Sequence, residues 1–248
     1  MTGTGVTGTG VTVSDPAARP EGFRPERFKS VMFDFGGVIT TSPFVAFGHY
    51  EVACGLPTGF IRRVNATNPD TNAWAQLERG QLGVDAFVDA FEAECLALGH
   101  PVDGRQVLAR LRGDIRPEMV EAVRRCRGRF VTGCLTNNFT AAAAGGVGGG
   151  GGGGPDQPEL AAVRDLFDVV VESRTAGVRK PEPRFYELAC ETAGVRPDEV
   201  VFLDDLGVNL KPARAMGMHT IKVAELGAAL AELAAVTGLA LADLTPVR

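Results

Sequence analysis

Two acidic positions, far apart in the chain, each follow a short apolar run. Asp34 comes directly after Val31-Met-Phe33, and Asp204-Asp205 come directly after Val200-Val-Phe-Leu203. Both runs are typical of buried strands, and open parallel sheets place their ligands at the carboxyl ends of their strands. If the two strands are neighbours, the carboxylates of Asp34 and Asp205 meet at one edge of the sheet.

Three further polar residues fall at or beyond the ends of apolar runs. Thr136-Asn137 offer a hydroxyl, an amide side chain and backbone N–H groups to an anionic oxygen. Lys180 lies in Arg179-Lys-Pro-Glu-Pro183, where the two prolines restrict the backbone. These residues predict a site for a small phosphorylated substrate, in which Lys180 supplies a fixed positive charge.

The chemistry of such a site requires a cation. Two carboxylates facing a phosphate dianion would repel it, and oxygen ligands without His or Cys favour Mg²⁺. Asp34 can then attack phosphorus and form an aspartyl-phosphate intermediate that water hydrolyses. We therefore predict a magnesium-dependent phosphatase.

The elements that must position these residues alternate between strand and helix. Apolar runs predict buried strands at 31–33, 130–135, 167–171, 200–203 and 220–223. Helices predicted between them include 117–127, which starts with Pro, and 183–194, which ends in Gly. This alternation predicts an α/β fold, a Rossmann-like three-layer arrangement of a parallel sheet with helices on both faces.

Composition divides the chain into segments. Thr-Gly repeats at the start and a Gly run near 150 cannot repay the entropy of ordering, whereas 44–113 has helical periodicity without a buried strand. We predict a disordered tail at 1–27, a core at 28–43 and 114–224, a helical cap at 44–113 inserted after the first strand, a flexible Gly-rich insertion at 141–158, and a C-terminal helix and tail at 225–248.

The bulk properties exclude several classes of partner. The net charge of −5 and the lack of a basic cluster argue against binding nucleic acid or anionic lipid. No apolar run approaches the roughly 20 residues that span a bilayer. The 5 cysteines are scattered, which fits reduced thiols and a cytoplasmic location. The sequence leaves the oligomeric state open.

Four motifs resemble those of the haloacid dehalogenase superfamily. They are Phe33-Asp-Phe-Gly-Gly-Val38, Leu135-Thr-Asn-Asn138, Arg179-Lys-Pro-Glu-Pro183 and Phe202-Leu-Asp-Asp-Leu-Gly-Val-Asn209. The similarity extends from Phe28 to the C-terminus. Its second half most resembles the amino-terminal phosphatase domain of soluble epoxide hydrolases and related domains fused to acyl-CoA dehydrogenases.

The resemblance implies a role for each matching residue. Implied are Asp34 as nucleophile and metal ligand, the Gly36 carbonyl and Asp205 as further metal ligands, Thr136 and Asn137 as phosphate contacts, Lys180 as charge stabiliser, and Asp204 and Asn209 as support for the metal site.

One departure from the family pattern concerns proton transfer. Phosphatases of this superfamily usually carry a second Asp two residues after the nucleophile, where this chain has Gly36. Because of Gly36 and the Gly-rich insertion, one alternative to the phosphatase is a catalytically weak phosphate-binding or regulatory domain. A second alternative is a 2-haloacid dehalogenase, which would also use Asp34 as nucleophile but would need no metal. The substrate is not readable, and candidates to line its site are Phe44, Phe47, Tyr50, Arg62, Arg63 and Trp74.

Overall fold

The fold is built on a five-stranded sheet with strand order β3-β2-β1-β4-β5. The computed structural model describes residues 27–111, 113–139 and 158–244. The strands are β1 (Ser30–Phe33), β2 (Val131–Thr136), β3 (Val169–Glu172), β4 (Val200–Asp204) and β5 (His219–Lys222). Every neighbouring pair runs parallel, so the predicted α/β fold with a parallel sheet is confirmed.

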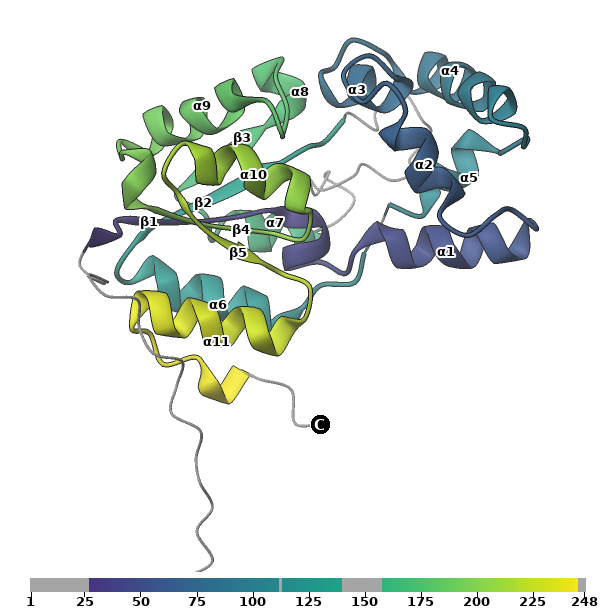
Figure 1. Cartoon of the computed structure of the whole chain (residues 1–248). Helices are drawn as coiled ribbons and strands as arrows, with labels where there is room; N and C mark the ends of the chain where they lie inside the picture. The colour runs from purple at the N-terminus through teal and green to yellow at the C-terminus, as the bar shows by residue number, and fades with distance from the viewer. Residues whose placement is uncertain (1–26, 112, 140–157, 245–248) are drawn as a thin grey trace, which may run out of the picture.

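Helices cover both faces of the sheet and complete three layers (Figure 1). One face carries α6 (Pro117–Arg127), α7 (Pro158–Arg164) and α11 (Leu226–Thr237), and the other carries α8 (Ser173–Ala176), α9 (Pro183–Ala193) and α10 (Gly207–Ala215). Successive strand residues point to opposite faces. Phe33 therefore packs in the cluster that includes Leu230 of α11, whereas Met32 packs in the cluster that includes Phe185 of α9.

The helix ends follow local sequence signals. Pro117 and Pro183 stand in the first turns of α6 and α9, where the missing N–H of proline costs no hydrogen bond. Gly194 and Gly238 end α9 and α11 in the left-handed conformation, with φ of 66° and 69°. These residues fix where α6 and α9 begin and where α9 and α11 end.

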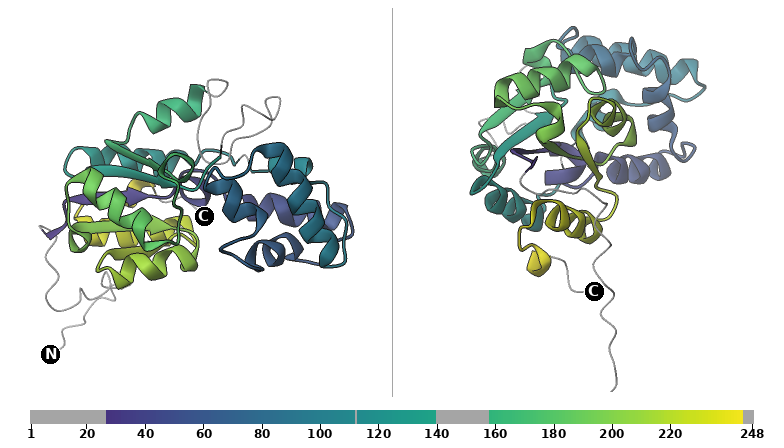
Figure 2. Two further views of the ribbon diagram at one scale, coloured as in Figure 1. Left: turned by 90° about the horizontal axis from the view of Figure 1, so that it is seen from above. Right: turned by 60° about the vertical axis from the view of Figure 1, so that its left-hand side comes forward.

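A group of helices lies between β1 and α6 and stands beside the sheet (Figures 1 and 2). It consists of α1 (Pro43–Ala53), α2 (Phe60–Ala66), α3 (Ala73–Glu78), α4 (Val84–Ala97) and α5 (Gly104–Ala109), which we call the helical segment. It has its own apolar cluster, which includes Phe60, Trp74, Phe87 and Phe91. An isolated antiparallel bridge between Thr40 and Ile115 joins the two connections that lead into and out of it.

Short turns complete the described chain. They are η2 (Phe35–Ile39), a helical turn broken by non-helical Gly36 and Gly37, η4 (Pro197–Glu199) and η5 (Ala242–Leu244). The predicted tail at 1–27 and the predicted Gly-rich insertion at 141–158 lie outside the described residues, apart from Arg27 and Pro158. In the part of the chain that the structure describes, no helix is both long and apolar enough to cross a membrane.

Candidate active site

Three aspartates meet where β1 and β4 end. Phe33 pairs with Leu203, so Asp34 and Asp204 are the next residues on two adjacent strands, and the Asp34 N–H continues the ladder by donating to the Leu203 carbonyl at 2.8 Å. Asp34, Asp204 and Asp205 each offer a carboxylate oxygen, and these oxygens lie within 4.8 Å of one another. The sheet thus brings together residues that the sequence separates by about 170 positions.

Lys180 lies between two of these carboxylates. Its Nζ is 2.8 Å from Asp34 Oδ1 and 2.8 Å from Asp204 Oδ2, and the residue is only 1% exposed. Burial opposes its positive charge, but the attraction of Asp204 and Asp34 outweighs that cost and raises the pKa of Lys180 above its ordinary value. The ammonium is therefore permanently charged and fixed in place.

Only one oxygen of the Asp34 carboxylate, Oδ1, has hydrogen-bond donors among the described residues. Oδ1 accepts hydrogen bonds from Lys180 Nζ at 2.8 Å and from the Phe35 N–H at 2.6 Å, whereas no donor among the described residues contacts Oδ2. Burial, together with the negative charges of Asp204 and Asp205, raises the pKa of Asp34 well above 3.8 despite the Lys180 charge. The buried surroundings therefore disfavour the ionised form of this carboxylate, and a bound cation would favour it.

Asp204 is fully buried and has hydrogen bonds to both oxygens. Asn209 Nδ2 donates to Oδ1 at 3.1 Å and to Oδ2 at 3.0 Å, and the Leu206 N–H donates to Oδ1 at 2.8 Å. Tyr186 in turn donates its hydroxyl to the Asn209 carbonyl at 2.7 Å. These contacts hold the carboxylate that faces Lys180.

Asp205 projects toward the turn that follows Asp34. Ser42 Oγ donates to Asp205 Oδ2 at 2.9 Å, and burial raises the pKa of Asp205. Gly37 has φ of 81°, and a Cβ there would lie 2.3 Å from the Asp205 carboxyl carbon. Only glycine therefore lets this turn approach the carboxylate so closely. A Cβ on Gly36, by contrast, would meet nothing within 4 Å.

The donor set fits a hard divalent cation. Three buried or half-buried carboxylates lie together, the Lys180 ammonium contacts two of them, and the cluster contains neither His nor Cys. Carboxylate and carbonyl oxygens are the ligands that Mg²⁺ prefers, and its charge would favour the ionised form of Asp34, whose pKa is raised first by burial and then by Asp204 and Asp205. The acidic cluster at the end of β1 and β4 is thus a candidate metal site.

Thr136 and Asn137 lie beside Lys180, where β2 ends. Thr136 is 2% exposed. Asn137 Nδ2 donates to the Lys180 carbonyl and to Glu78 Oε2, both at 3.0 Å, and its Oδ1 accepts from the Lys180 N–H at 2.9 Å. The Asn137 amide therefore holds the main chain of Lys180 and is already occupied, rather than open to a ligand.

Comparison with known proteins decides the family of this fold and site. Residues 28–217 match the profile of the haloacid dehalogenase-like hydrolases. The chain belongs to the haloacid dehalogenase-like hydrolase family. The predicted membership is confirmed, and with it the prediction that the protein is a hydrolase.

The relatives of this hydrolase agree with the predicted subgroup. It is 32% identical to acyl-CoA dehydrogenase family member 10 of Mus musculus, over 86% of the hydrolase and 19% of the relative. It is 31% identical to bifunctional epoxide hydrolase 2 of Mus musculus, over 83% and 38% of the two chains. The hydrolase thus spans a minor part of these relatives.

A shorter relative matches over most of its own length. The hydrolase is 34% identical to phosphatase MT3486 of Mycobacterium tuberculosis, over 80% of its own chain and 88% of the relative. The crystal structure of a haloacid dehalogenase family enzyme from Bacteroides thetaiotaomicron, in complex with magnesium and inorganic phosphate, has the same fold, with a TM-score of 0.51 and 21% identity over 80% and 96% of the two chains.

Sequence reasoning missed three residues that the hydrolase places near its acidic cluster. Ser42 contacts Asp205, Glu78 contacts Asn137, and Arg116 Nη1 donates to the Gly37 carbonyl at 3.0 Å. Ser42 could have been noticed, because Ser before Pro43 is a helix-start signal shortly after the turn that follows Asp34. Glu78 and Arg116 carry no local signal, since their roles depend on packing between distant segments.

The candidate residues for lining the substrate site mostly pack within the helical segment. Phe47, Tyr50 and Trp74 are buried in its apolar cluster. The exposed Arg62 lies with its guanidinium carbon 5.1 Å from the centre of the Phe44 ring. In the hydrolase these aromatic residues therefore serve packing first.

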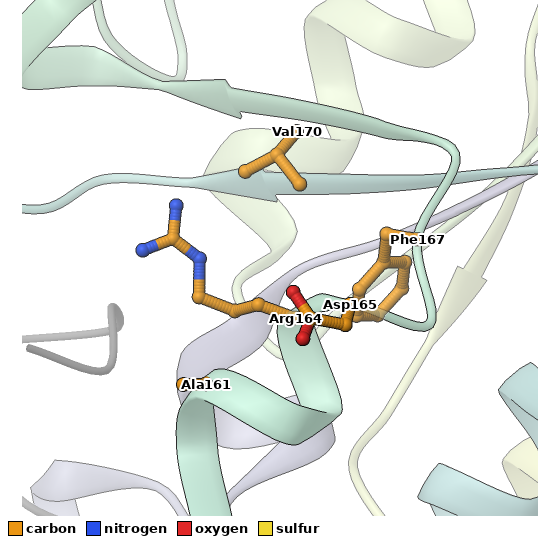
Figure 3. Close-up of a pocket in the computed structure, with 5 residues that line it drawn as sticks. All are labelled: Ala161, Arg164, Asp165, Phe167 and Val170. Atoms are coloured by element: carbon orange, nitrogen blue, oxygen red, sulfur yellow. The ribbon is translucent and has the colours of Figure 1, made fainter. Parts of the chain in front are cut away.

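A separate hollow of about 410 Å³ lies beside β3 (Figure 3). Ala161, Arg164, Asp165, Phe167 and Val170 line it. None of Asp34, Asp204 and Asp205 lines it, and its Arg164 is paired with Glu172 at 2.8 Å. We therefore centre the candidate active site on the acidic cluster and not on this hollow.

Proposed function

We propose that the protein is a Mg²⁺-dependent phosphatase that acts on a small phosphorylated metabolite through an aspartyl-phosphate intermediate. The observation that carries this proposal is the meeting of Asp34, Asp204 and Asp205 around Lys180. The phosphatase name of a relative that the chain matches over 88% of its length supports the substrate class.

The residues divide the work at the reacting phosphorus. Lys180 fixes Oδ1 of Asp34, which leaves Oδ2 as the attacking oxygen. Attack forms a bond from Oδ2 to phosphorus and breaks the bond from phosphorus to the ester oxygen. Water then attacks the phosphorus of the aspartyl phosphate, which releases inorganic phosphate and restores the carboxylate.

Further groups of the chain would bind the phosphoryl oxygens. The Thr136 hydroxyl, the main-chain N–H of Asn137 and Lys180 Nζ supply donors. Mg²⁺, held by Asp34, the Gly36 carbonyl and Asp205, would orient a phosphoryl oxygen and offset its charge. Asp204 and Asn209 support this arrangement, because Asn209 donates to both oxygens of Asp204.

Gly36 bears on which substrates react quickly. Without a side chain there, no carboxylic acid two residues after Asp34 protonates the departing oxygen. General acid catalysis is worth roughly 10² to 10⁴ in rate, so esters with a good leaving group should be hydrolysed fastest. Aryl and acyl phosphates are therefore the first substrates to examine.

The dehalogenase alternative also uses Asp34 as nucleophile but needs no metal. The buried Asp204 and the half-buried Asp205 next to Asp34 favour the phosphatase, because a site for an anionic haloacid gains nothing from added carboxylates. A weak phosphate-binding domain would keep the same geometry and differ only in turnover.

The test is phosphate release from 4-nitrophenyl phosphate, acetyl phosphate and a sugar 1-phosphate, measured in magnesium and in EDTA. We expect release in magnesium, loss in EDTA, and at least roughly 10³-fold loss in Asp34→Asn, because the nucleophile is removed. The exposed Asp89→Asn is the matched control and should keep full activity.

Three outcomes would contradict the proposal. No release in magnesium, together with tight binding of a phosphate analogue, would indicate the binding domain. Release that EDTA leaves unchanged would exclude the metal. Chloride release from 2-chloropropionate without phosphatase activity would indicate the dehalogenase.

A further inference from the structure

The last residue of α3 reaches out of the helical segment to the loop that carries Lys180. Glu78 Oε2 lies 2.6 Å from Arg179 Nε and accepts a hydrogen bond from Asn137 Nδ2 at 3.0 Å. The side chains of Glu78 and Arg179 are only 17% and 16% exposed. A carboxylate so far from solvent depends on these two partners for its charge.

Asn137 links Glu78 to the main chain of Lys180. Its amide group donates to the Lys180 carbonyl at 3.0 Å and accepts from the Lys180 N–H at 2.9 Å, so it holds that peptide from both sides. Glu78 takes the remaining capacity of the same Nδ2 and thereby fixes the orientation of the amide. A chain of hydrogen bonds thus runs from α3 through Asn137 to the backbone of the buried lysine.

A second pair of ions holds the same loop from its other end. Arg79 Nη2 lies 2.7 Å from Glu182 Oε1, with side chains that are 15% and 29% exposed. Arg79 Nη1 also donates to the Asp70 carbonyl at 2.7 Å, which ties the guanidinium to the helical segment. Consecutive residues of the helical segment, one acidic and one basic, thus pair with opposite charges on either side of Lys180.

Apolar packing also joins the helical segment to the sheet, because Phe139, just after β2, is buried in the apolar cluster of the helical segment. The helical segment has its own apolar cluster, and the sheet has two others. Glu78 lies outside those clusters, and its partners Arg179 and Asn137 lie on the Lys180 loop and directly after β2, where they offset the cost of removing its carboxylate from water. The contacts of Glu78 with Arg179 and Asn137 therefore add a polar link between the helical segment and the loop that carries Lys180.

We propose that Glu78 is a positioning residue, which acts through Asn137 and Arg179 to hold Lys180 against Asp34 when the helical segment is seated. Lys180 Nζ must stay within hydrogen-bonding distance of two aspartates at once, so a small displacement of its loop would break one of the contacts. The kinetic part of this inference rests on the proposed function.

The experiment compares Glu78→Gln with Glu199→Gln as a matched control. Glu199 is also a buried, paired glutamate, with a side chain 6% exposed and 2.7 Å from Lys29, but it lies at the opposite end of β4. We expect Glu78→Gln to lower kcat by about tenfold with KM changed less than about twofold, because catalytic geometry is lost rather than binding. Glu199→Gln should keep its kcat.

A second readout does not depend on any activity. Limited acetylation with acetic anhydride, followed by peptide mass spectrometry, measures how accessible each lysine is. Lys180 should be protected in the wild-type protein and in Glu199→Gln, but several-fold more reactive in Glu78→Gln, relative to Lys211 and Lys222 in the same sample. If the chain proved to have no phosphatase activity, this measurement would still decide the positioning role.

Arg179→Lys provides a second variant in case Glu78→Gln folds poorly. It keeps the positive charge of the ion pair with Glu78 but not the planar guanidinium, so we expect a smaller fall in kcat and a smaller rise in Lys180 acetylation. Unchanged kcat and unchanged Lys180 protection in a folded Glu78→Gln protein would overturn the proposal. An equal effect in Glu199→Gln would overturn it as well, because general destabilisation would then explain the result.

Discussion

At the scale of single residues, the site is defined by an imbalance of charge. Asp34, Asp204 and Asp205 are close enough to share a cation, and Lys180 is the ammonium between the first two. Lys180 contacts Oδ1 of Asp34, yet burial, together with the charges of Asp204 and Asp205, still raises the pKa of that carboxyl. A divalent cation is the simplest group that would complete this arrangement.

Gly36 offers a direct test of the missing proton donor. It has φ of −69° and ψ of 129°, which any residue adopts, and a Cβ there meets nothing within 4 Å. We expect Gly36→Asp to raise kcat for an alkyl phosphate by about tenfold to a hundredfold, because it restores a general acid. The rate with 4-nitrophenyl phosphate, whose leaving group needs no proton, should change much less.

Gly36→Asn is the control for this substitution, since it has the same size but cannot transfer a proton in this way. Steady-state kinetics with both substrates gives the comparison. An alkyl phosphatase rate that stays unchanged or falls in Gly36→Asp would show that water or a substrate hydroxyl already handles the proton.

At the scale of elements, α3 is a short helix with an unusually well-bonded start. Asn72 Oδ1 accepts from the Ala75 N–H at 2.8 Å, and its Nδ2 donates to the carbonyls of Asn65 and Thr67 at 2.9 and 3.0 Å. The residue is 3% exposed. One buried amide therefore fixes the start of the helix whose last residue is Glu78.

We expect Asn72→Ala to lower the free energy of unfolding by about 2 to 4 kcal/mol, from the lost cap and the unpaired carbonyls together. Asp103→Ala is the matched control, because Asp103 caps α5 in the same way at 3.0 Å but is exposed. It should cost only about 1 kcal/mol. Urea denaturation followed by circular dichroism measures both, and equal losses would show that burial of the Asn72 amide adds nothing.

At the scale of the whole molecule, burial of the Asp34 carboxylate should make the free energy of unfolding depend on pH and on magnesium. A carboxyl whose pKa is higher in the folded state binds more protons there, so its contribution to stability falls as pH rises. In EDTA, the wild-type protein should therefore lose stability relative to Asp34→Asn as the pH rises above 3.8, until the raised folded pKa of Asp34 is passed.

The measurement is the thermal unfolding of the wild-type protein and of Asp34→Asn across this pH range. Adding magnesium at neutral pH should raise the Tm of the wild-type protein more than that of Asp34→Asn, because a ligand of the folded state stabilises it. A wild-type Tm that rises with pH relative to the variant would contradict the raised pKa of Asp34. A wild-type Tm that magnesium leaves unchanged would contradict the metal site.

The sequence by itself determined the alternation of elements and the family. Apolar runs and helix-start or helix-end residues are local, so the strands and helices such as 117–127 and 183–194 could be predicted from neighbouring residues alone. Motifs at strand ends then located Asp34, Thr136, Lys180 and Asp205, because a parallel sheet brings its carboxyl ends to one edge.

Only the tertiary structure decided how these groups share their contacts. That the Asn137 amide is occupied by Lys180, that Glu78 reaches it from α3, and that Ser42 holds Asp205 depends on side chains from separate segments meeting within about 3 Å. No local pattern specifies such meetings, since each requires the packing of the helical segment beside the sheet to be known first.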